Sequence, residues 1–307
     1  MRYAIGIDIG GTKISSGIVN EAGDLIQQET VSSDPSDKES MFGRVLKCVE
    51  QLMDHSSISV HDIYGVGAGV PGKVDWDNGI AVYQNNLPWE NFPFVKRLRD
   101  KLGFERIVMD NDVYMAAFAE WRNAELHAGE TFVYVTISTG ISSSIMQDGE
   151  FLRGAGFAGE IGLIPVVASR NGNGWERLEK VASGPALEKR ARQLYQDDQM
   201  TTKDIFTAYY RGDASAKQLV EDAGSSIAQA VYIINSVIDP HKIVFGGSVI
   251  AHNPVLLDII KQKLKRYLLA EQMHILDAME VSQLGSGQGV IGAGLSVFQQ
   301  SNVRVMG

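Results

Sequence analysis

A carboxylate followed by a glycine turn stands near the start of the chain, in the segment Asp8-Ile-Gly-Gly-Thr-Lys13. Glycines let backbone N–H groups approach phosphate oxygens closely, and Thr12 adds a hydroxyl. Asp8 can hold a hydrated Mg²⁺ against the same oxygens. The segment therefore predicts a turn that binds nucleotide phosphates through Gly10, Gly11, Thr12 and Lys13. The alternative is a hairpin turn with an incidental aspartate.

Two later turns offer the same chemistry. The segment Thr136-Ile-Ser-Thr-Gly140 repeats the hydroxyls and the glycine, in Ser138, Thr139 and Gly140, and Gly246-Gly247 follows another strand. Three such turns in one chain favour nucleotide binding over a set of incidental hairpins. The chain contains neither a GxxxxGK[ST] loop nor a GxGxxG turn followed by a helix, which argues against P-loop and Rossmann nucleotide sites.

Two further strands of the first half also end in polar or glycine-rich turns. The segment Ile63 to Ala68 predicts a strand that leads into Gly69-Val70-Pro71-Gly72. The segment Arg106 to Met109 predicts another, which leads into Asp110-Asn111-Asp112 at the start of a helix. The carboxyl ends of strands are the usual place for ligands in α/β sheets, so both turns are candidate binding segments.

The elements that must position these turns can be read from hydrophobic spacing. Tyr3 to Ile9 and Ile14 to Val19 predict two antiparallel strands on either side of the first glycine turn. Residues 38–54 then show apolar positions at helical spacing, which predicts an amphipathic helix with Cys48 on its buried face. The role expected for Cys48 is packing.

The second half of the chain opens in the same way as the first. Strands are expected again over Thr131 to Gln147, and Gly11–Val19 laid over Ser138–Met146 matches at five of nine positions. Chance similarity between two serine-rich hairpins is one reading. The other is a duplicated strand–turn–strand unit, one in each domain. Helices are expected to dominate after about residue 176, with one last strand at Lys242–Phe245.

Length, charge and cysteine content limit the number of domains, the classes of partner and the location. The length of 307 residues exceeds what one hydrophobic core usually serves, which predicts two domains. The 28 Lys and Arg against 37 Asp and Glu give a net charge of −9, which argues against a nucleic-acid partner. No apolar run reaches the roughly 20 residues of a membrane span, so no membrane partner is expected. Cys48 alone can form neither an internal disulfide nor a multi-cysteine zinc site, which favours the cytoplasm.

Eight motifs follow one another along the chain: Asp8-Ile-Gly-Gly-Thr-Lys13, Gly69-Val-Pro-Gly72, Asn86-Leu-Pro-Trp-Glu-Asn91, Asn111-Asp112, Ser138-Thr-Gly140, Ala158-Gly-Glu-Ile-Gly162, Glu179 to Pro185 and Asp239-Pro-His-Lys-Ile-Val-Phe-Gly-Gly247. In this order they resemble the motifs of the repressor, open-reading-frame and kinase (ROK) family of bacterial sugar kinases. The resemblance covers nearly the whole chain, and the ordered set is far more specific than any one motif.

The resemblance implies an α/β, actin-like (RNase H-like) two-domain sugar kinase fold that closes on a sugar and ATP. The last helix is expected to return to the N-terminal domain. We therefore expect one domain of residues 1–112 with about 295–307, and a larger one of residues 113–294. The implied cofactors are ATP and Mg²⁺, and a homodimer is compatible with the resemblance.

Asp112 matches the family's general base, and the chemistry gives this role a reason. A sugar hydroxyl is a poor nucleophile until its proton is accepted as the γ-phosphoryl group moves. Asp110 or Asn111 can cap the following helix, whose N-terminus should help to keep Asp112 ionised. Without the resemblance, Asp112 would be read as an ordinary carboxylate at a helix start.

The resemblance also implies the residues that bind the sugar. Asn86, Asn111 and Glu160 match ligands of the sugar hydroxyls, and Glu179 matches a further carboxylate for them. Carboxylates and amides suit neighbouring hydroxyls because each offers two polar atoms. Glu179 by itself would be read as a surface charge on a helix.

Two departures from the family pattern concern zinc. Zinc-containing members have a histidine three residues after the first glutamate, where this chain has Leu163, and clustered cysteines where it has Asn171 to Arg177. We therefore expect no zinc, with the loop ordered by packing and Trp175 as its anchor. The missing histidine weakens an assignment to glucose or N-acetylmannosamine by analogy, and some zinc-free relatives phosphorylate β-glucosides.

The sequence thus predicts a cytoplasmic, ATP- and Mg²⁺-dependent sugar kinase that phosphorylates a hexose hydroxyl, with C6 the expected position. The candidate substrates are glucose, N-acetylmannosamine and a β-glucoside. Family repressors carry a helix-turn-helix before the first strand, which here begins at residue 3, so a kinase is favoured. A non-catalytic sugar-binding regulator and an actin-like ATPase are the alternatives.

Overall fold

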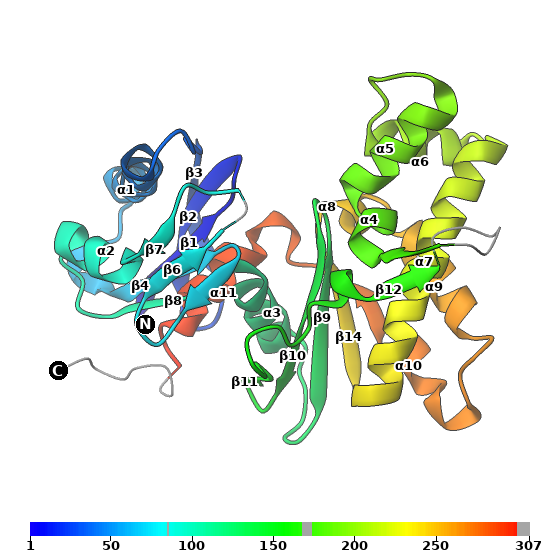
Figure 1. Ribbon diagram of the computed structural model, residues 1–307. Coiled ribbons are helices and arrows are strands. Elements are labelled where there is room, and N and C mark those ends of the chain that lie inside the picture. The colour runs from blue at the N-terminus through cyan, green and yellow to red at the C-terminus, as the bar shows by residue number, and fades with distance from the viewer. Residues whose placement is uncertain (85, 168–173, 300–307) are drawn as a thin grey trace. The chain divides into compact units, whose positions relative to one another are not determined.

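The computed structural model describes residues 1–84, 86–167 and 174–299 (Figure 1). The chain forms two compact units: the first comprises Met1–Glu125 and Ser286–Gly307, and the second Leu126–Gly285. These boundaries differ from the predicted 1–112 and about 295–307. The reason is that helix α3 (Asp112–Asn123) packs on helix α11 (Gln288–Ser296), and both belong to the first unit.

The first unit is built on a five-stranded sheet in the order β3-β2-β1-β4-β8. Its strands are β1 (Tyr3–Ile9), β2 (Lys13–Asn20), β3 (Leu25–Ser32), β4 (Ile63–Val70) and β8 (Ile107–Asn111). Strand β1 pairs antiparallel with β2 and parallel with β4, and β4 pairs parallel with β8. The predicted antiparallel start is therefore confirmed.

The second unit repeats this topology in the order β11-β10-β9-β14-β15. Its strands are β9 (Thr131–Ile137), β10 (Ile141–Gln147), β11 (Glu150–Phe151), β14 (Lys242–Gly246) and β15 (Met279–Val281). The three strands β9 to β11 form an antiparallel meander, while β14 and β15 run parallel to β9. The similar segments found in the sequence fall on β2 and β10, so the duplication is confirmed. The strand predicted at Lys242–Phe245 is confirmed as β14, but it is not the last strand, because β15 follows it.

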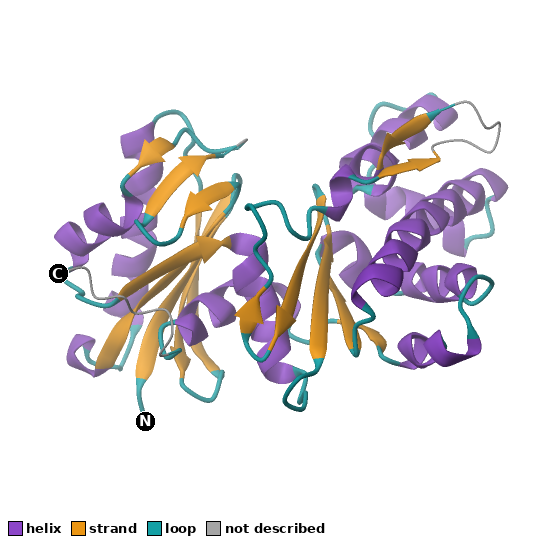
Figure 2. Cartoon of the chain, turned by 60° about the horizontal axis from the view of Figure 1, so that its bottom comes forward, coloured by secondary structure: helices purple, strands orange, loops and turns teal. Residues whose placement is uncertain are grey.

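Smaller elements complete each unit (Figure 2). The first unit adds the antiparallel strands β5 (Lys73–Asp75), β6 (Ile80–Tyr83) and β7 (Glu90–Phe92), helix α2 (Phe94–Leu102) and the 3₁₀ turn η1 (Val60–Asp62). The second adds strands β12 (Pro165–Val167) and β13 (Trp175–Arg177) and helices α4 (Leu178–Ala182), α5 (Gly184–Tyr195), α6 (Thr202–Tyr210), α7 (Ala214–Ile238), α8 (Ser248–His252), α9 (Val255–Leu264) and α10 (His274–Asp277). The 3₁₀ turns η2 (Ile161–Leu163), η3 (Ala270–Gln272) and η4 (Gly285–Gly287) connect them.

Helix α1 (Lys38–His55) forms where the spacing of apolar residues predicts an amphipathic helix. Asp37 caps it, because one of its carboxylate oxygens accepts hydrogen bonds from the N–H groups of Glu39 and Ser40 at 2.8 and 2.9 Å. Cys48 is fully buried, and this burial raises the pKa of its thiol. The predicted packing role of Cys48 is confirmed.

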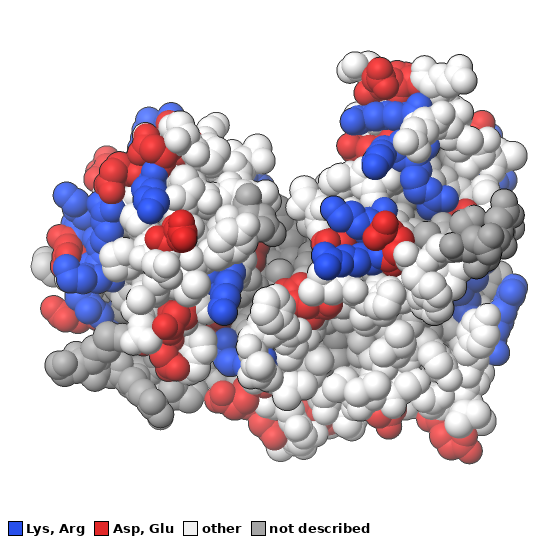
Figure 3. Space-filling view, in the orientation of Figure 1, with Lys and Arg blue, Asp and Glu red and all other residues white. Residues whose placement is uncertain are grey.

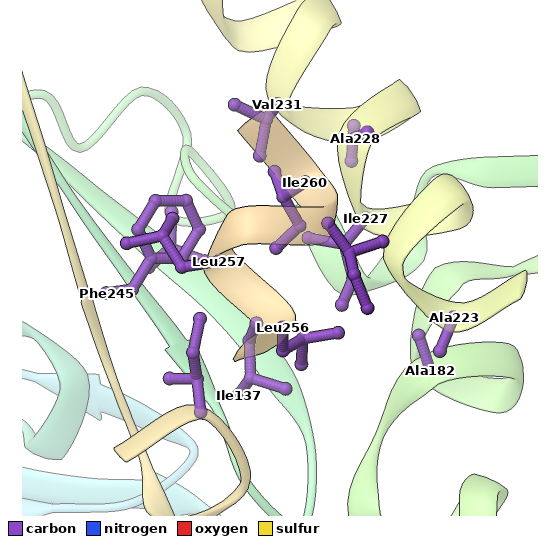
Figure 4. Packing of buried hydrophobic residues seen from close by; sticks show 14 of the residues in the cluster. Ile137, Ala182, Ala223, Ile227, Ala228, Val231, Phe245, Leu256, Leu257 and Ile260 are labelled. Carbon is purple, nitrogen blue, oxygen red and sulfur yellow. The ribbon is translucent and has the colours of Figure 1, made fainter. Parts of the chain in front are cut away.

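The core of the second unit lies between its sheet and helices α7 and α9 (Figure 4). Ile227 and Val231 of α7 face Leu256 and Ile260 of α9, and all four side chains are fully buried. Phe245 reaches the same cluster from β14. Burying each such side chain contributes about 1.5 to 3 kcal/mol, so this layer holds the helices firmly on the sheet.

The surface carries mixed charge. On the face shown in Figure 3, both acidic and basic side chains are spread over each unit. Within the described ranges of the chain, no helix is both long and apolar enough to cross a lipid bilayer.

Helix α11 returns to the first unit and packs against β1, β4 and α3, as the predicted return of the last helix requires. Glycines make this contact possible. A Cβ atom on Gly67 of β4 would lie 1.8 Å from the carbonyl oxygen of Ala293, and one on Gly292 would lie 1.7 Å from that of Met115. These distances are far below van der Waals contact, so only glycine allows the helix to approach so closely.

We expect Gly292→Ala to destabilise the first unit by about 1 to 3 kcal/mol or more, because the new methyl group would meet the backbone of α3. The matched control is Gly43→Ala on α1, where no atom lies within 4 Å of the added carbon. That change should stabilise the protein by about 0.5 to 1 kcal/mol through helix propensity. Urea unfolding of both variants is the measurement, and equal stability of the two would contradict the packing of α11.

Candidate active site

Three parallel strands of the first unit end side by side in the predicted binding turns. Across the sheet, Asp8 on β1 is the register partner of Gly69 on β4, and Gly69 is the partner of Asp110 on β8. The chain leaves the sheet just after this row, at the carboxyl ends of the strands. The first glycine turn, the Gly69–Gly72 turn and the start of α3 therefore share one edge.

The first glycine turn is closed by hydrogen bonds of its own backbone. The N–H of Gly10 donates to the carbonyl oxygen of Lys13 at 2.9 Å, and the Ser33 hydroxyl donates to the carbonyl of Gly10 at 2.6 Å. The backbone of Gly10 and Gly11 keeps ordinary negative φ values. Space is tight at position 11, because an added Cβ would lie 3.1 Å from the Cβ of Asn86. The turn and Asn86 are thus neighbours.

Asp8 lies at the base of this turn and is partly buried. Burial raises the pKa of Asp8 to about 6, and the positive charge of Lys13 acts in the opposite direction. The carboxyl group packs against the backbone of α11, since a Cβ on Gly289 would come within 2.6 Å of the Asp8 Cγ. A carboxylate that is costly to ionise in the empty protein is suited to a site where a cation arrives with the ligand.

Asn111 and Asp112 stand at the first turn of α3. The Asn111 Oδ1 accepts from the N–H of Val113 at 2.9 Å, so Asn111 is the cap of the two predicted candidates, Asp110 and Asn111. Its Nδ2 donates to the carbonyl of Gly72 at 2.9 Å. A Cβ on Gly69 would lie 3.3 Å from the Asp112 Cα. Asp112 thus stands in the first turn of α3, and a helix N-terminus is a place that favours negative charge.

In the second unit, the other two predicted turns meet. The N–H of Ser138 donates to the carbonyl of Gly140 at 2.9 Å. Gly246 is the register partner of Thr136 on the neighbouring strand. Gly247 has a φ of 87°, and a Cβ there would lie 2.5 Å from the carbonyl oxygen of Ile137. The structure therefore brings the Ser138–Gly140 turn and Gly246-Gly247 to the same edge of the second sheet.

A cavity of about 640 Å³ opens beside these turns. Ser138 and Thr139 line one side of it, together with Ser248, which directly follows Gly247. Phe206 of α6 and Val249 of α8 provide an apolar wall. This size and this combination of a few polar groups with apolar walls are typical of a small-molecule site.

Sequence reasoning missed the part of this cavity that comes from helices. Gly184 and Pro185, at the start of α5, also line it, and the N–H of Gly184 donates to the carbonyl of Ser138 at 2.8 Å. Ser183 caps the helix through a hydrogen bond from the N–H of Ala186. The signal was a serine cap followed by a proline in the first turn, which marks the N-terminus of a helix, a place that favours anions. The contribution of Phe206 had no local signal.

Glu160 is fixed by the glycines on either side of it. A Cβ on Gly159 would lie 2.2 Å from the carbonyl oxygen of Ser143, and one on Gly162 would lie 2.1 Å from that of Ile141. The segment can therefore lie flat on β10 only with glycine at both positions. The Ser143 hydroxyl and N–H both donate to the carbonyl of Gly159, at 2.7 and 2.8 Å.

Glu160 and Glu179 lie in the second unit as a pair of carboxylates. Partial burial raises the pKa of Glu160, a hydrogen bond with Ser142 acts in the opposite direction, and the negative charge of Glu179 adds to the rise. Glu179 is held on α4, whose first residue, Leu178, donates its N–H to the carbonyl of Ile164 at 2.9 Å. Two adjacent carboxylates that repel each other suit a ligand with hydroxyl donors, which would relieve the repulsion.

The loop that carries cysteines in zinc-containing relatives is described only in part, because residues 168–173 lie outside the described ranges. Over the described residues, no group of three or more His, Cys, Asp or Glu side chains could hold a metal ion. The prediction that Trp175 anchors this loop by packing is wrong, since 73% of its surface is exposed. On β12, the strand that pairs with the strand of Trp175, Val166 is fully buried.

Comparison with known proteins identifies the family of this chain. The ROK family model matches residues 4–300. The chain belongs to the ROK family. It is 30% identical to a protein named glucokinase from Halalkalibacterium halodurans, over 98% of this chain and 96% of the relative.

Solved structures of ROK proteins match this chain over nearly its full length. A ROK family glucokinase from Streptomyces griseus, in complex with glucose and AMPPNP, is 26% identical, with a TM-score of 0.79 over 95% of this chain and 97% of that one. A ROK hexokinase from Thermus thermophilus is 28% identical, with a TM-score of 0.77 over 96% and 98%. The fold is the actin-like, two-domain fold of ROK sugar kinases.

We expect Asp8→Asn to stabilise the empty protein at neutral pH. The folded-state pKa of about 6 exceeds the usual 3.8, so the folded protein holds this proton more tightly than the unfolded chain does. Ionisation therefore lowers stability as pH rises from 4 to 6, by about 3 kcal/mol at most. The variant should be more stable than the wild type at pH 7 and equal to it below pH 4.

Urea unfolding from pH 4 to 8 measures this difference. Asp77→Asn is the control, because Asp77 is an exposed carboxylate of the same unit. An advantage of Asp8→Asn that does not change with pH would show that the carboxyl group is not the cause.

Proposed function

We propose that this protein is an ATP-dependent hexose kinase that transfers the γ-phosphoryl group to the C6 hydroxyl of glucose or a glucosyl sugar. The class, ATP-dependent sugar phosphorylation, follows from the ROK family and from relatives named glucokinase. The observation that carries the proposal is the cavity of the second unit, where the Ser138–Gly140 turn meets the start of α5 and an apolar wall.

The chemistry of this cavity fits a purine nucleotide. The base would lie on the apolar wall of Phe206 and Val249, and the phosphates would lie toward Ser138, Thr139 and the N-terminus of α5. Backbone N–H groups can bind phosphate without the help of basic side chains. This suits a chain whose net charge is −9. Gly140, Gly246 and Gly247 would act by shaping the turns.

The first glycine turn, Gly10 to Lys13, would bind phosphate oxygens in the same manner, and Asp8 would hold Mg²⁺ through water. Bound Mg²⁺ would neutralise charge on the phosphates during transfer. Arrival of the cation would also make ionisation of Asp8 favourable, which fits its raised pKa in the empty protein. Zinc has no part in this proposal.

Asp112 would act as the general base. It would accept the proton of the C6 hydroxyl while that oxygen forms its bond to the γ-phosphorus and the bond from the γ-phosphorus to the β–γ bridging oxygen breaks. Asn86, Asn111, Glu160 and Glu179 would bind the remaining hydroxyls. Glucose is the first sugar to test, because the relatives are named for it.

An ADP-release assay with glucose, N-acetylmannosamine and other hexoses tests the function. A kinase releases ADP only with the correct sugar. An actin-like ATPase would release it without sugar, and a non-catalytic sugar-binding regulator would release none.

A cytoplasmic location fits both the supply of ATP and the single reduced cysteine, Cys48.

We expect Asp112→Asn to lower kcat by about 10²-fold or more while glucose binding changes little, because the amide keeps the shape but cannot accept the proton. Steady-state kinetics and calorimetric binding of glucose measure the two effects. A loss of less than tenfold in kcat/KM would remove Asp112 from the role of base.

We also expect the purified protein to keep its activity and melting temperature in a chelator that leaves Mg²⁺ free. Structural zinc needs about four Cys or His donors, and the segment 160–183 contains neither residue type. Elemental analysis that finds one zinc per chain, lost together with activity on chelation, would contradict this expectation.

A further inference from the structure

The cavity of the second unit contains a carboxylate that belongs to none of the turns described above. Glu188 of α5 lines this cavity together with Thr202 of α6. One oxygen of the Glu188 carboxylate accepts hydrogen bonds from the N–H and the hydroxyl of Thr202, both at 3.0 Å. The other oxygen accepts a hydrogen bond from the Nη2 of Arg192 at 3.3 Å. Glu188 is therefore held in one orientation on the cavity wall.

These hydrogen bonds decide what the two side chains can offer to a ligand. A carboxylate has about four acceptor positions, and the three hydrogen bonds of Glu188 occupy only part of them. The hydroxyl of Thr202 has a single hydrogen, which it donates to Glu188, so its lone pairs remain as acceptors. Glu188 and Thr202 therefore suit a ligand group that donates hydrogen bonds, such as a pair of neighbouring hydroxyls.

Helical spacing places this pair beside the end of the cavity that is assigned to the phosphates. Glu188 follows Gly184 by four residues on α5, so it lies about one turn, or roughly 6 Å, from the start of the helix. A Cβ atom on Gly184 would lie 3.6 Å from the hydroxyl oxygen of Thr202, so α6 begins close to the same point. Phe206 follows Thr202 by four residues and lies one turn further along α6.

The order of these groups matches the order of the groups in a nucleotide. A helix N-terminus, then hydrogen-bond acceptors, then an aromatic ring follow one another along the wall, and in a nucleotide the ribose lies between the phosphates and the base. The 2′ and 3′ hydroxyls of the ribose are neighbouring donors, and carboxylates bind ribose hydroxyls in other nucleotide sites. A phosphate chain without a nucleoside offers no such donors.

We propose that Glu188, together with the Thr202 hydroxyl that it orients, binds the ribose hydroxyls of the phosphoryl donor. The proposal rests on the proposed function and names its donor class: a ribonucleoside triphosphate, in preference to a deoxynucleotide or an inorganic polyphosphate. Glu188 contacts a part of the donor that does not react. Its role is therefore donor binding and specificity, and it takes no proton during the transfer.

The test measures kcat/KM for ATP, 2′-deoxyATP and 3′-deoxyATP at saturating glucose. In the wild type, ATP should exceed at least one deoxynucleotide by about tenfold or more, because a hydrogen bond to a charged group is lost. Glu188→Gln should lower the ATP value by a similar factor and that of the same deoxynucleotide by less than threefold. Glutamine keeps one oxygen for Thr202 and replaces the other by an NH₂ group, which cannot accept a hydrogen bond.

Two further variants separate ribose binding from a structural effect. Thr202→Val keeps the shape of the side chain without its hydroxyl, and it should also reduce the preference for ATP. Asp204→Asn is the matched control. The carboxylate of Asp204 accepts from the N–H and the hydroxyl of Thr201 at 3.0 and 2.6 Å, at the same end of α6 but outside the cavity lining. This change should leave the ratio between ATP and each deoxynucleotide as it is in the wild type.

The proposal is overturned if ATP and both deoxynucleotides react equally well in the wild type, or if tripolyphosphate replaces ATP without loss. It is also overturned if Glu188→Gln lowers the values of all three nucleotides by one common factor, which would make the residue structural.

If no sugar is phosphorylated with any donor, the proposed function has failed. Calorimetric titration of wild type and Glu188→Gln with ADP and its 2′-deoxy and 3′-deoxy analogues then decides the subsite by itself. A preference for ADP that Glu188→Gln removes supports the ribose contact, whereas equal binding or no binding overturns it.

Discussion

Close contact of one backbone with another, made possible by glycine, is the constraint on which the sites of this protein depend. In the first unit, Gly67 and Gly292 let α11 pack on the sheet and on α3, and Gly289 of the same helix lies against the carboxyl group of Asp8. In the second unit, Gly159 and Gly162 press the Glu160 segment onto β10 in the same way. A single methyl group at these positions would displace the carboxylates that the proposed chemistry uses.

Electrostatics adds a second constraint, because the negative charges of Asp8 and Glu160 are not fully compensated within the protein. Burial raises the pKa of Asp8 despite Lys13, and burial together with Glu179 raises that of Glu160. Charges of this kind lower the stability of the empty protein, and they are favourable only when a ligand supplies a cation or hydroxyl donors. Catalytic sites commonly carry such unfavourable charges, and stabilising changes at them tend to remove function.

The two units share a topology but differ in the chemistry that they carry. Each sheet begins with a hairpin whose turn bears glycine and hydroxyl groups, and each continues in parallel strands that end at the same edge. The first unit adds a helix whose N-terminus presents Asp112, while the second adds the helices α5, α6 and α8 around a cavity. The second unit also carries the exposed Trp175, at the start of β13.

The sequence by itself determined the features that depend on near neighbours along the chain. These are the strand–turn–strand units, the buried face of α1, and, through the ordered motifs, the family and its fold. Only the tertiary structure decided that Asn86 lies beside Gly11, that Phe206 closes the cavity, that α3 and α11 belong to one unit, and that Trp175 is exposed. The physical reason is that turns, caps and periodic faces are set by local backbone geometry. Burial and cavity walls instead arise from contacts between residues that are distant in the sequence, and no local pattern records these.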